Sequence, residues 1–173
     1  RAAEEARAFE ATLFVPERGN WLDLRGARDL AEARRVGCCG LAWCHGAPGI
    51  LLARLVGIQG LDTGEVRADI DAALATIEKA PAGGIDQCCC GEAGVIDILV
   101  SAAAAPGCRE LMDTARTRAA ALLMKARAKG GYDAFGVAAL PAGPGFFQGL
   151  AGIGYTWLRL AQPERFPSVL AFA

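Results

Sequence analysis

Residues 42–49 read AWCHGAPG, residues 87–94 read QCCCGEAG, and residues 146–154 read FFQGLAGIG. All three stretches contain Gly-x-x-Gly, and alignment on these glycines places Cys44 opposite Cys89 and Phe147. The next aligned position holds, in order, His45, Cys90 and Gln148. Two of the three units thus carry thiols at equivalent positions, and a radially repeated fold would bring those thiols together.

The three patterns introduce apolar helical stretches, at 50–58, 93–105 and 149–161. Their near-continuous apolarity predicts inner helices that are buried on most sides. The amphipathic stretches between them, 64–79 and 108–129, predict outer helices that expose one face. The first glycines of the patterns recur about 45 and then about 58 residues apart, which indicates a repeat architecture. We therefore expect an all-α fold, a partial α/α toroid of alternating inner and outer helices.

The remaining segments are assigned from local signals. Residues 2–14 predict an amphipathic helix, and residues 15–25 predict an irregular segment or short hairpin that Trp21 and Leu24 anchor to the core. A shorter helix is expected over about 27–36. The Pro- and Gly-rich stretch 132–145 is interpreted as an insertion that accommodates the longer interval between repeats.

Composition limits the classes of function. The chain has 173 residues, enough for one domain, and a net charge of −1 from 18 basic and 19 acidic residues. This balance gives no general attraction to nucleic acid or anionic lipid. The mean hydropathy is +0.28, yet Gly or charge interrupts every apolar run before the length of a transmembrane helix.

The seven cysteines do not suggest a disulfide framework. Their number is odd, several are adjacent in sequence, and the sequence contains no stretch with the basic start and apolar core of a secretory signal. We therefore expect a reducing, cytoplasmic compartment in which thiols are available as metal ligands.

Cys44, Cys89 and Cys90 are the candidate metal ligands. Three thiolates that converge from two glycine turns suit a zinc ion with an open fourth position. The other cysteines are expected to be small buried hydrophobes: Cys38, Cys39, Cys88 and Cys108. Cys88 would project away from the ligand pair. His45, the single histidine, is a candidate ligand, acid/base group or helix cap, and we expect a structural role or one beside the metal.

Three carboxylates lie near the second pattern, at Asp86, Glu92 and Asp97. We interpret them as helix-end and solvated groups rather than catalytic ones. A glycosidase on a helical toroid would need paired carboxylates at the starts of inner helices. Glu92 alone occupies such a position, so this alternative ranks last.

Several stretches resemble the C-terminal part of LanC-like cyclases, in particular the cyclase domain of class II lanthipeptide synthetases. They are WCHGAPGI at 43–50, CCGEAG at 89–94, FFQGLAGIGYTWLRL at 146–160, FPSVLAF at 166–172 and LFVPERGNWLDLR at 13–25. The resemblance spans nearly the whole chain, with the patterns in the family's order. Cys-Cys-Gly at the second pattern, where many members have Cys-His-Gly, resembles the three-cysteine branch of the class II enzymes.

The resemblance implies an α/α toroid that binds one zinc ion through Cys44, Cys89 and Cys90. It implies that zinc activates cysteine thiols of a precursor peptide for Michael-type addition to dehydroamino acids, which forms lanthionine rings. Residues 1–173 would be the C-terminal portion of the cyclase domain, a fragment without the earlier repeats. The expected partners are the precursor peptide, the remainder of the cyclase domain and a dehydratase domain.

The sequence also departs from the family's pattern. The family's toroid is about twice as long, and its earlier repeats hold a catalytic His and Asp without counterparts here; His45 lies in a different pattern. Two alternatives therefore stand beside a cyclase portion. One is a LanC-like fragment or homologue that binds zinc and peptide without catalysis, and the other is a helical repeat module whose cysteines are merely buried.

Overall fold

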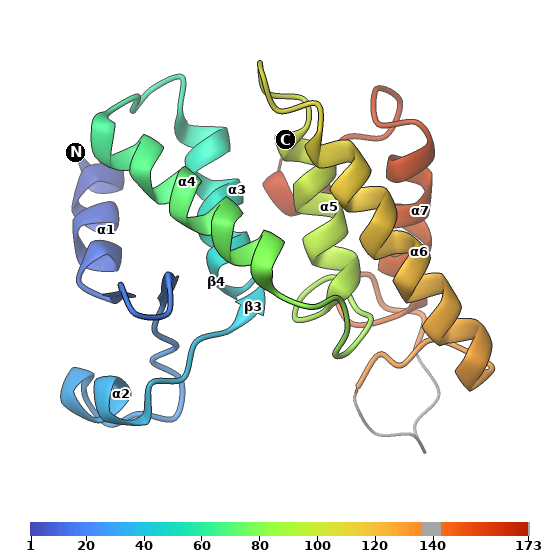
Figure 1. Ribbon diagram of the computed structural model, residues 1–173, viewed down its shortest axis with the longest axis horizontal. Helices are drawn as coiled ribbons and strands as arrows, with labels where there is room; N and C mark the ends of the chain where they lie inside the picture. The colour runs from blue at the N-terminus through green and yellow to red at the C-terminus, as the bar shows by residue number, and fades with distance from the viewer. Residues whose placement is uncertain (136–142, 173) are drawn as a thin grey trace.

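The computed structural model describes residues 1–135 and 143–172, and within them the chain is mostly helical (Figure 1). The helices are α1 Ala2–Ala11, α2 Leu30–Val36, α3 Ala47–Gly57, α4 Gly64–Lys79, α5 Glu92–Ala102, α6 Leu111–Lys129, α7 Leu150–Ala161 and the 3₁₀ helix η1 Val169–Ala171. Two antiparallel hairpins of two-residue strands pair β1 Phe14–Val15 with β2 Asn20–Trp21, and β3 Leu41–Ala42 with β4 His45–Gly46. The all-α prediction is confirmed.

The helices form an inner and an outer layer, as the alternation of apolar and amphipathic stretches predicted. The inner helix α5 packs between α3 and α7, while α4 packs on α3 and α6 packs on α5 (Figure 1). This is the arrangement of successive units of an α/α toroid. Because each inner helix starts directly after the first glycine of its pattern, the three patterns gather at the same end of the inner layer.

Burial follows the sequence patterns. Helix α5 buries ten of its eleven residues, including Ile96, Ile98 and Leu99, which are fully buried. The outer helix α4 buries a stripe that contains Val66 and Ile77 and exposes the opposite face. An inner helix that is apolar on most sides and an outer helix with one apolar stripe are the two forms that such a double layer requires.

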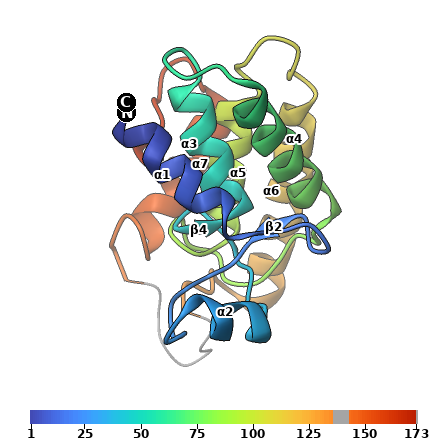
Figure 2. The ribbon, with the colours of Figure 1, turned by 90° about the vertical axis from the view of Figure 1, so that its left-hand side faces the viewer.

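The N-terminal region differs in part from expectation. Helix α1 ends at Ala11, buries none of its residues and leaves Phe9 57% exposed, so the helix predicted over 2–14 has no buried face. It lies beside α3, where Arg54 of α3 pairs with Glu10 (2.7 Å) (Figure 2). The predicted hairpin is present as β1–β2, and Trp21 is buried against Phe14.

The three carboxylates expected to be solvated are buried, which corrects that prediction. Asp86, Glu92 and Asp97 are at most 3% exposed. Each pairs with a cation from a neighbouring helix: Asp86 with Lys125, Glu92 with Arg118 (2.6 Å) and Asp97 with Arg159 (2.8 Å). A buried carboxylate needs such a partner, because the desolvation of an unpaired charge is costly. Glu92 is therefore a structural group, which argues against the glycosidase alternative.

The stretch 132–145, interpreted as an insertion, lies partly outside the described residues. Within the described part of the chain, no helix combines the length and the apolar character that crossing a membrane requires.

Candidate metal centre

Each Gly-x-x-Gly pattern packs its helix start against the loop that precedes it. A β carbon on the second glycine would lie 1.9–2.2 Å from the carbonyl oxygen of the residue six positions earlier. These contacts join Gly49 to Trp43, Gly94 to Cys88 and Gly152 to Phe146. The first glycines make the same contact, with Gly40, Ile85 and Gly143. The predicted close approach of chains is thus observed in all three units, although Gly46 alone of the first glycines has a positive φ, 81°.

Backbone hydrogen bonds join the equivalent positions of neighbouring units. The N–H of Cys44 donates to the carbonyl oxygen of Cys89 (3.3 Å), and the N–H of Cys89 donates to the carbonyl oxygen of Phe147 (2.8 Å). The three aligned residues therefore lie in one hydrogen-bonded row. Since the first two are cysteines, this row places two thiols of adjacent units side by side.

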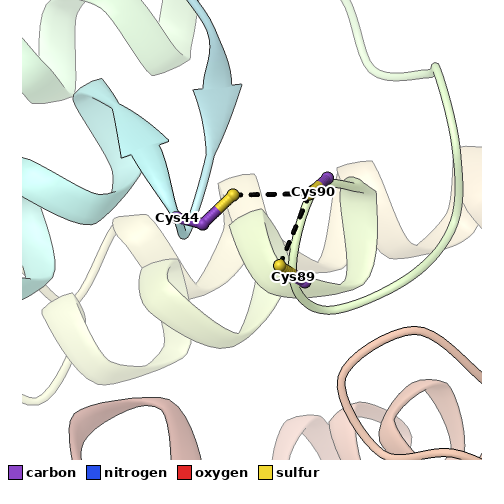
Figure 3. Close-up of side chains that lie close together, drawn as sticks. All are labelled: Cys44, Cys89 and Cys90. Atoms are coloured by element: carbon purple, nitrogen blue, oxygen red, sulfur yellow. Dashed lines mark hydrogen bonds between the residues drawn. The ribbon is translucent and has the colours of Figure 1, made fainter. Parts of the chain in front are cut away.

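The sulfur atoms of Cys44, Cys89 and Cys90 lie within 4.8 Å of one another. Cys44 occupies the tip of the β3–β4 hairpin, and the other two lie in the turn before α5 (Figure 3). The Sγ of Cys90 is 3.3 Å from that of Cys44 and 3.4 Å from that of Cys89. Tetrahedral zinc with Zn–S bonds of about 2.3 Å holds its sulfur ligands roughly 3.8 Å apart. The spacing and the donor set therefore fit a zinc ion.

Without a metal, this arrangement disfavours the thiolate form. Burial, followed by the neighbouring thiol of Cys90, raises the pKa of the Cys44 thiol. Burial and the thiols of Cys90 and Cys44 raise the pKa of Cys89 to about 12. A divalent cation at this point would reverse both effects, because it stabilises the thiolates that the neighbours destabilise.

The other cysteines lie outside this cluster. Cys88 is buried, its Sγ lies 3.5 Å from the hydroxyl of Thr156 on α7, and burial raises its pKa to about 11. Its Sγ contacts α7 and is not part of the cluster of three thiols. Cys38 is exposed, while Cys39 and Cys108 are partly buried, so the expectation of fully buried side chains is wrong for these three. Their place next to loops and turns, outside the buried helix faces, accounts for the difference.

His45 borders the sulfur cluster. Its Nδ1 lies 3.2 Å from the Sγ of Cys44, and the Nη2 of Arg25 lies 2.6 Å from the same Nδ1. Burial, then the charge of Arg25, lowers the pKa of His45, whereas the Asp23 carboxylate raises it by a smaller effect. The imidazole therefore belongs to the surroundings of the three thiols, and a role for it in acid/base chemistry stays a prediction.

Sequence reasoning did not assign Asp23 and Arg25 to the site. The guanidinium of Arg25 binds both carboxylate oxygens of Asp23 and lies 3.9 Å from the Sγ of Cys44. This ion pair lowers the pKa of Asp23 to about 2. The available signal was the Asp-Leu-Arg triplet that begins two residues after β2, but its contact with the β3–β4 hairpin spans about twenty residues and has no periodic signature.

Aromatic side chains flank the cluster. The ring of Trp43, next to Cys44, stacks on that of Phe147 with centroids 5.3 Å apart. The indole Nε1 of Trp43 also donates to the carbonyl oxygen of Leu170 in η1 (3.1 Å). The loop of the third pattern, which lacks thiols, thus contributes an aromatic wall beside the hairpin tip.

Comparison with known proteins gives one family. Residues 1–171 match a family model described as lanthionine synthetase C-like protein. A search of curated proteins found no match.

Proposed function

This chain belongs to the lanthionine synthetase C-like family, and from that premise we propose that it is the zinc-binding portion of a lanthionine cyclase. The reaction class is addition of a peptide cysteine thiol to a dehydroalanine or dehydrobutyrine of the same precursor peptide. The S–H adds across the carbon–carbon double bond: sulfur bonds to the β carbon, and a proton reaches the α carbon. No external oxidant or reductant is needed.

Cys44, Cys89 and Cys90 would hold the metal. The observation that carries this proposal is the convergence of their three sulfur atoms within 4.8 Å, from two neighbouring units. Three protein ligands leave a fourth tetrahedral position for a substrate. Zinc bound there would supply Lewis acidity toward the sulfur of an incoming peptide cysteine and favour its thiolate form.

The chain's own residues shape the approach to this site. The hairpin tip carries Cys44 on one side, and the turn before α5 carries the other two thiols. Phe147, 36% exposed, extends the aromatic wall at its edge. We propose that this wall orients the peptide so that its cysteine points toward the three thiols, since apolar stacking excludes water without adding charge.

The finer assignments are part of the same proposal. Residues 1–173 would form the C-terminal portion of the cyclase domain of a class II synthetase, in the branch with three cysteine ligands. The support is the order of the three glycine patterns and the Cys-Cys-Gly of the second. A precursor peptide, the remainder of the domain and a dehydratase domain would be its partners.

Metal analysis of the purified chain tests the site. We expect about one zinc per chain in the wild type and in the C38S control, and less than about a tenth of that in C44S, C89S and C90S. Cys38 is a matched control because it is an exposed cysteine outside the cluster. A zinc-free wild type would favour the alternative of a helical module whose cysteines bind nothing.

Cyclisation is tested with a dehydrated peptide. Because ring formation leaves the mass unchanged, the readout is the loss of thiols that an alkylating reagent can modify. Because the resemblance puts the catalytic His and Asp in earlier repeats, the assay uses this chain as part of a complete cyclase domain, in which the wild type with zinc is expected to consume thiols faster than C44S.

A second function, binding of zinc and peptide without catalysis, is favoured by one observation. The Nδ1 of the single histidine faces the Arg25 guanidinium, which only donates hydrogen bonds, so this nitrogen is engaged within the protein. Zinc at about one per chain and saturable peptide binding, with no loss of thiols, would select this function.

A further inference from the structure

A chain of polar contacts runs from the loop after β2 to the sulfur cluster. It starts at the carboxylate of Asp23, passes through the guanidinium of Arg25 to the ring of His45, and ends at the Sγ of Cys44. The segment 23–25 and the β3–β4 hairpin are thereby joined by side chains at the point where the hairpin presents its thiol.

Arg25 is held in one orientation by Asp23. Its Nε lies 2.9 Å from Oδ1 and its Nη2 lies 2.7 Å from Oδ2, while its own backbone N–H also donates to Oδ1 (2.9 Å). Such two-point binding fixes the plane of a guanidinium as well as its position. The side chain is therefore ordered although it is 61% exposed.

The fixed guanidinium in turn orients His45. The Nη2 of Arg25 lies 2.6 Å from Nδ1 of the imidazole, and a guanidinium has donors but no acceptor. The same Nη2 also lies 3.0 Å from Nε2, so the guanidinium contacts both ring nitrogens and fixes where the imidazole lies. The space around the ring is also restricted, because a β carbon on Gly40 would lie 1.8 Å from the imidazole.

The same guanidinium places a positive charge beside the sulfur atoms. Its Nη1 lies 3.9 Å from the Sγ of Cys44. Three thiolates around a divalent cation carry a net charge of −1, and a substrate thiolate would add another. A cation at this distance offsets part of that charge without occupying a coordination position.

We propose that Arg25 is a positioning residue of the metal centre: clamped by Asp23, it fixes the hairpin tip that carries Cys44 and compensates the charge of the thiolates. This inference rests on the proposed function, because it assumes that the three cysteines bind a metal. Arg25 lies in a loop outside the three glycine patterns. Metal affinity is therefore predicted to depend on a residue that is not a ligand.

The test measures zinc affinity by competition with a chromophoric chelator, at fixed pH and ionic strength. R25Q removes the positive charge and the two-point binding of the Asp23 carboxylate. R25K keeps the charge but not the two-point binding, and R28A is the matched control. Arg28 is also an exposed arginine paired with one carboxylate, that of Glu32, but lies outside the chain of contacts. We expect R25Q to lower zinc affinity by about 10- to 100-fold, R25K by about 5-fold or more, and R28A by less than about 2-fold.

The visible spectrum of the Co²⁺-loaded chain provides a second readout. If Arg25 positions Cys44, the thiolate-to-cobalt charge-transfer bands of R25Q and R25K shift or weaken, which a general loss of stability would not produce. A loss below about 5-fold in R25Q, or wild-type affinity and spectrum in R25K, would overturn the inference. These results differ from failure of the proposed function, in which the wild type itself binds no zinc. Circular dichroism checks that each variant is folded.

Discussion

Gly94 lies so close to Cys88 that a β carbon on residue 94 would be 2.0 Å from the carbonyl oxygen of Cys88. That oxygen belongs to the residue directly before the two cysteines of the second pattern. The first turn of α5 and the thiol-bearing turn are therefore in backbone contact, and an added side chain must displace one of them.

Replacement of Gly94 by alanine tests this contact. G94A is expected to lower the free energy of unfolding by about 1–3 kcal/mol, because the new methyl group meets backbone that cannot move aside at low cost. It should also weaken zinc binding, since the displaced turn carries Cys89. Denaturant titration and chelator competition measure the two effects.

Gly154 provides the matched control. It also lies in an inner helix, α7, but a β carbon there would meet nothing within 4 Å. G154A is expected to stabilise the chain by about 0.5–1 kcal/mol, since alanine loses less backbone entropy than glycine in a helix. Equal effects of the two substitutions would contradict the role assigned to the glycine pattern.

The buried pair of Glu92 and Arg118 predicts a large loss of stability when one partner is removed. E92A leaves a guanidinium that is 6% exposed without its carboxylate, although it still donates to the carbonyl oxygens of Ile77 and Ala80. We expect the free energy of unfolding to fall by about 3–5 kcal/mol. D113A, which breaks an exposed pair with Arg116, should cost less than about 1 kcal/mol. A similar cost for both would mean that the Glu92 pair is not desolvated.

The Asp23 carboxylate predicts a pH-dependent contribution to stability. Arg25 lowers its pKa in the folded chain to about 2, from 3.8. A lowered pKa means that the unfolded chain binds the proton more tightly. The stabilisation is therefore fully present above about pH 4 and is lost as the pH falls toward about 2. The difference in unfolding free energy between wild type and D23N should be constant above this window and shrink within it. A difference that stays constant down to pH 2 would contradict the ion pair.

Metal affinity should depend steeply on pH. Because burial and neighbouring thiols raise the pKa of Cys44 and Cys89, both are protonated near neutral pH in the metal-free chain, and zinc must displace those protons. We expect the apparent zinc affinity to rise by about tenfold or more per pH unit between about pH 6 and about pH 8. Calorimetry in buffers of different ionisation enthalpy counts the protons released. Release of no proton would show that the thiolates exist before the metal arrives.

Local signals in the sequence predicted both the helical layers and the meeting of the three thiols. Apolar periodicity and repeated glycines are local signals, and alignment of the repeats converts them into spatial neighbours, as for Cys44 and Cys89. The contact of Arg25 with His45 has no such signal, because it joins two irregular segments. The buried state of Asp86 and Glu92 was also missed, since the sequence around a carboxylate does not reveal the partner cation supplied by a distant helix.

The third thiolate of the site predicts a difference in reactivity. By the resemblance to LanC-like cyclases, Cys90 stands where many members have histidine, and its Sγ lies within 3.4 Å of the sulfur atoms of both Cys44 and Cys89. In C90H a neutral imidazole would replace a thiolate, which removes one negative charge from the ligand set. A less negative ligand set makes the metal a stronger Lewis acid and leaves a substrate thiolate less nucleophilic.

Within a complete cyclase domain, we therefore expect C90H to cyclise a dehydrated peptide about 3- to 10-fold more slowly than the wild type at equal zinc occupancy, and with fewer ring isomers. Loss of alkylatable thiols gives the rate, and tandem mass spectrometry gives the ring pattern. Zinc content is measured on the same samples, because an unloaded variant would also be slow. Equal rates and equal ring patterns at full occupancy would show that the charge of the third ligand does not control the reaction.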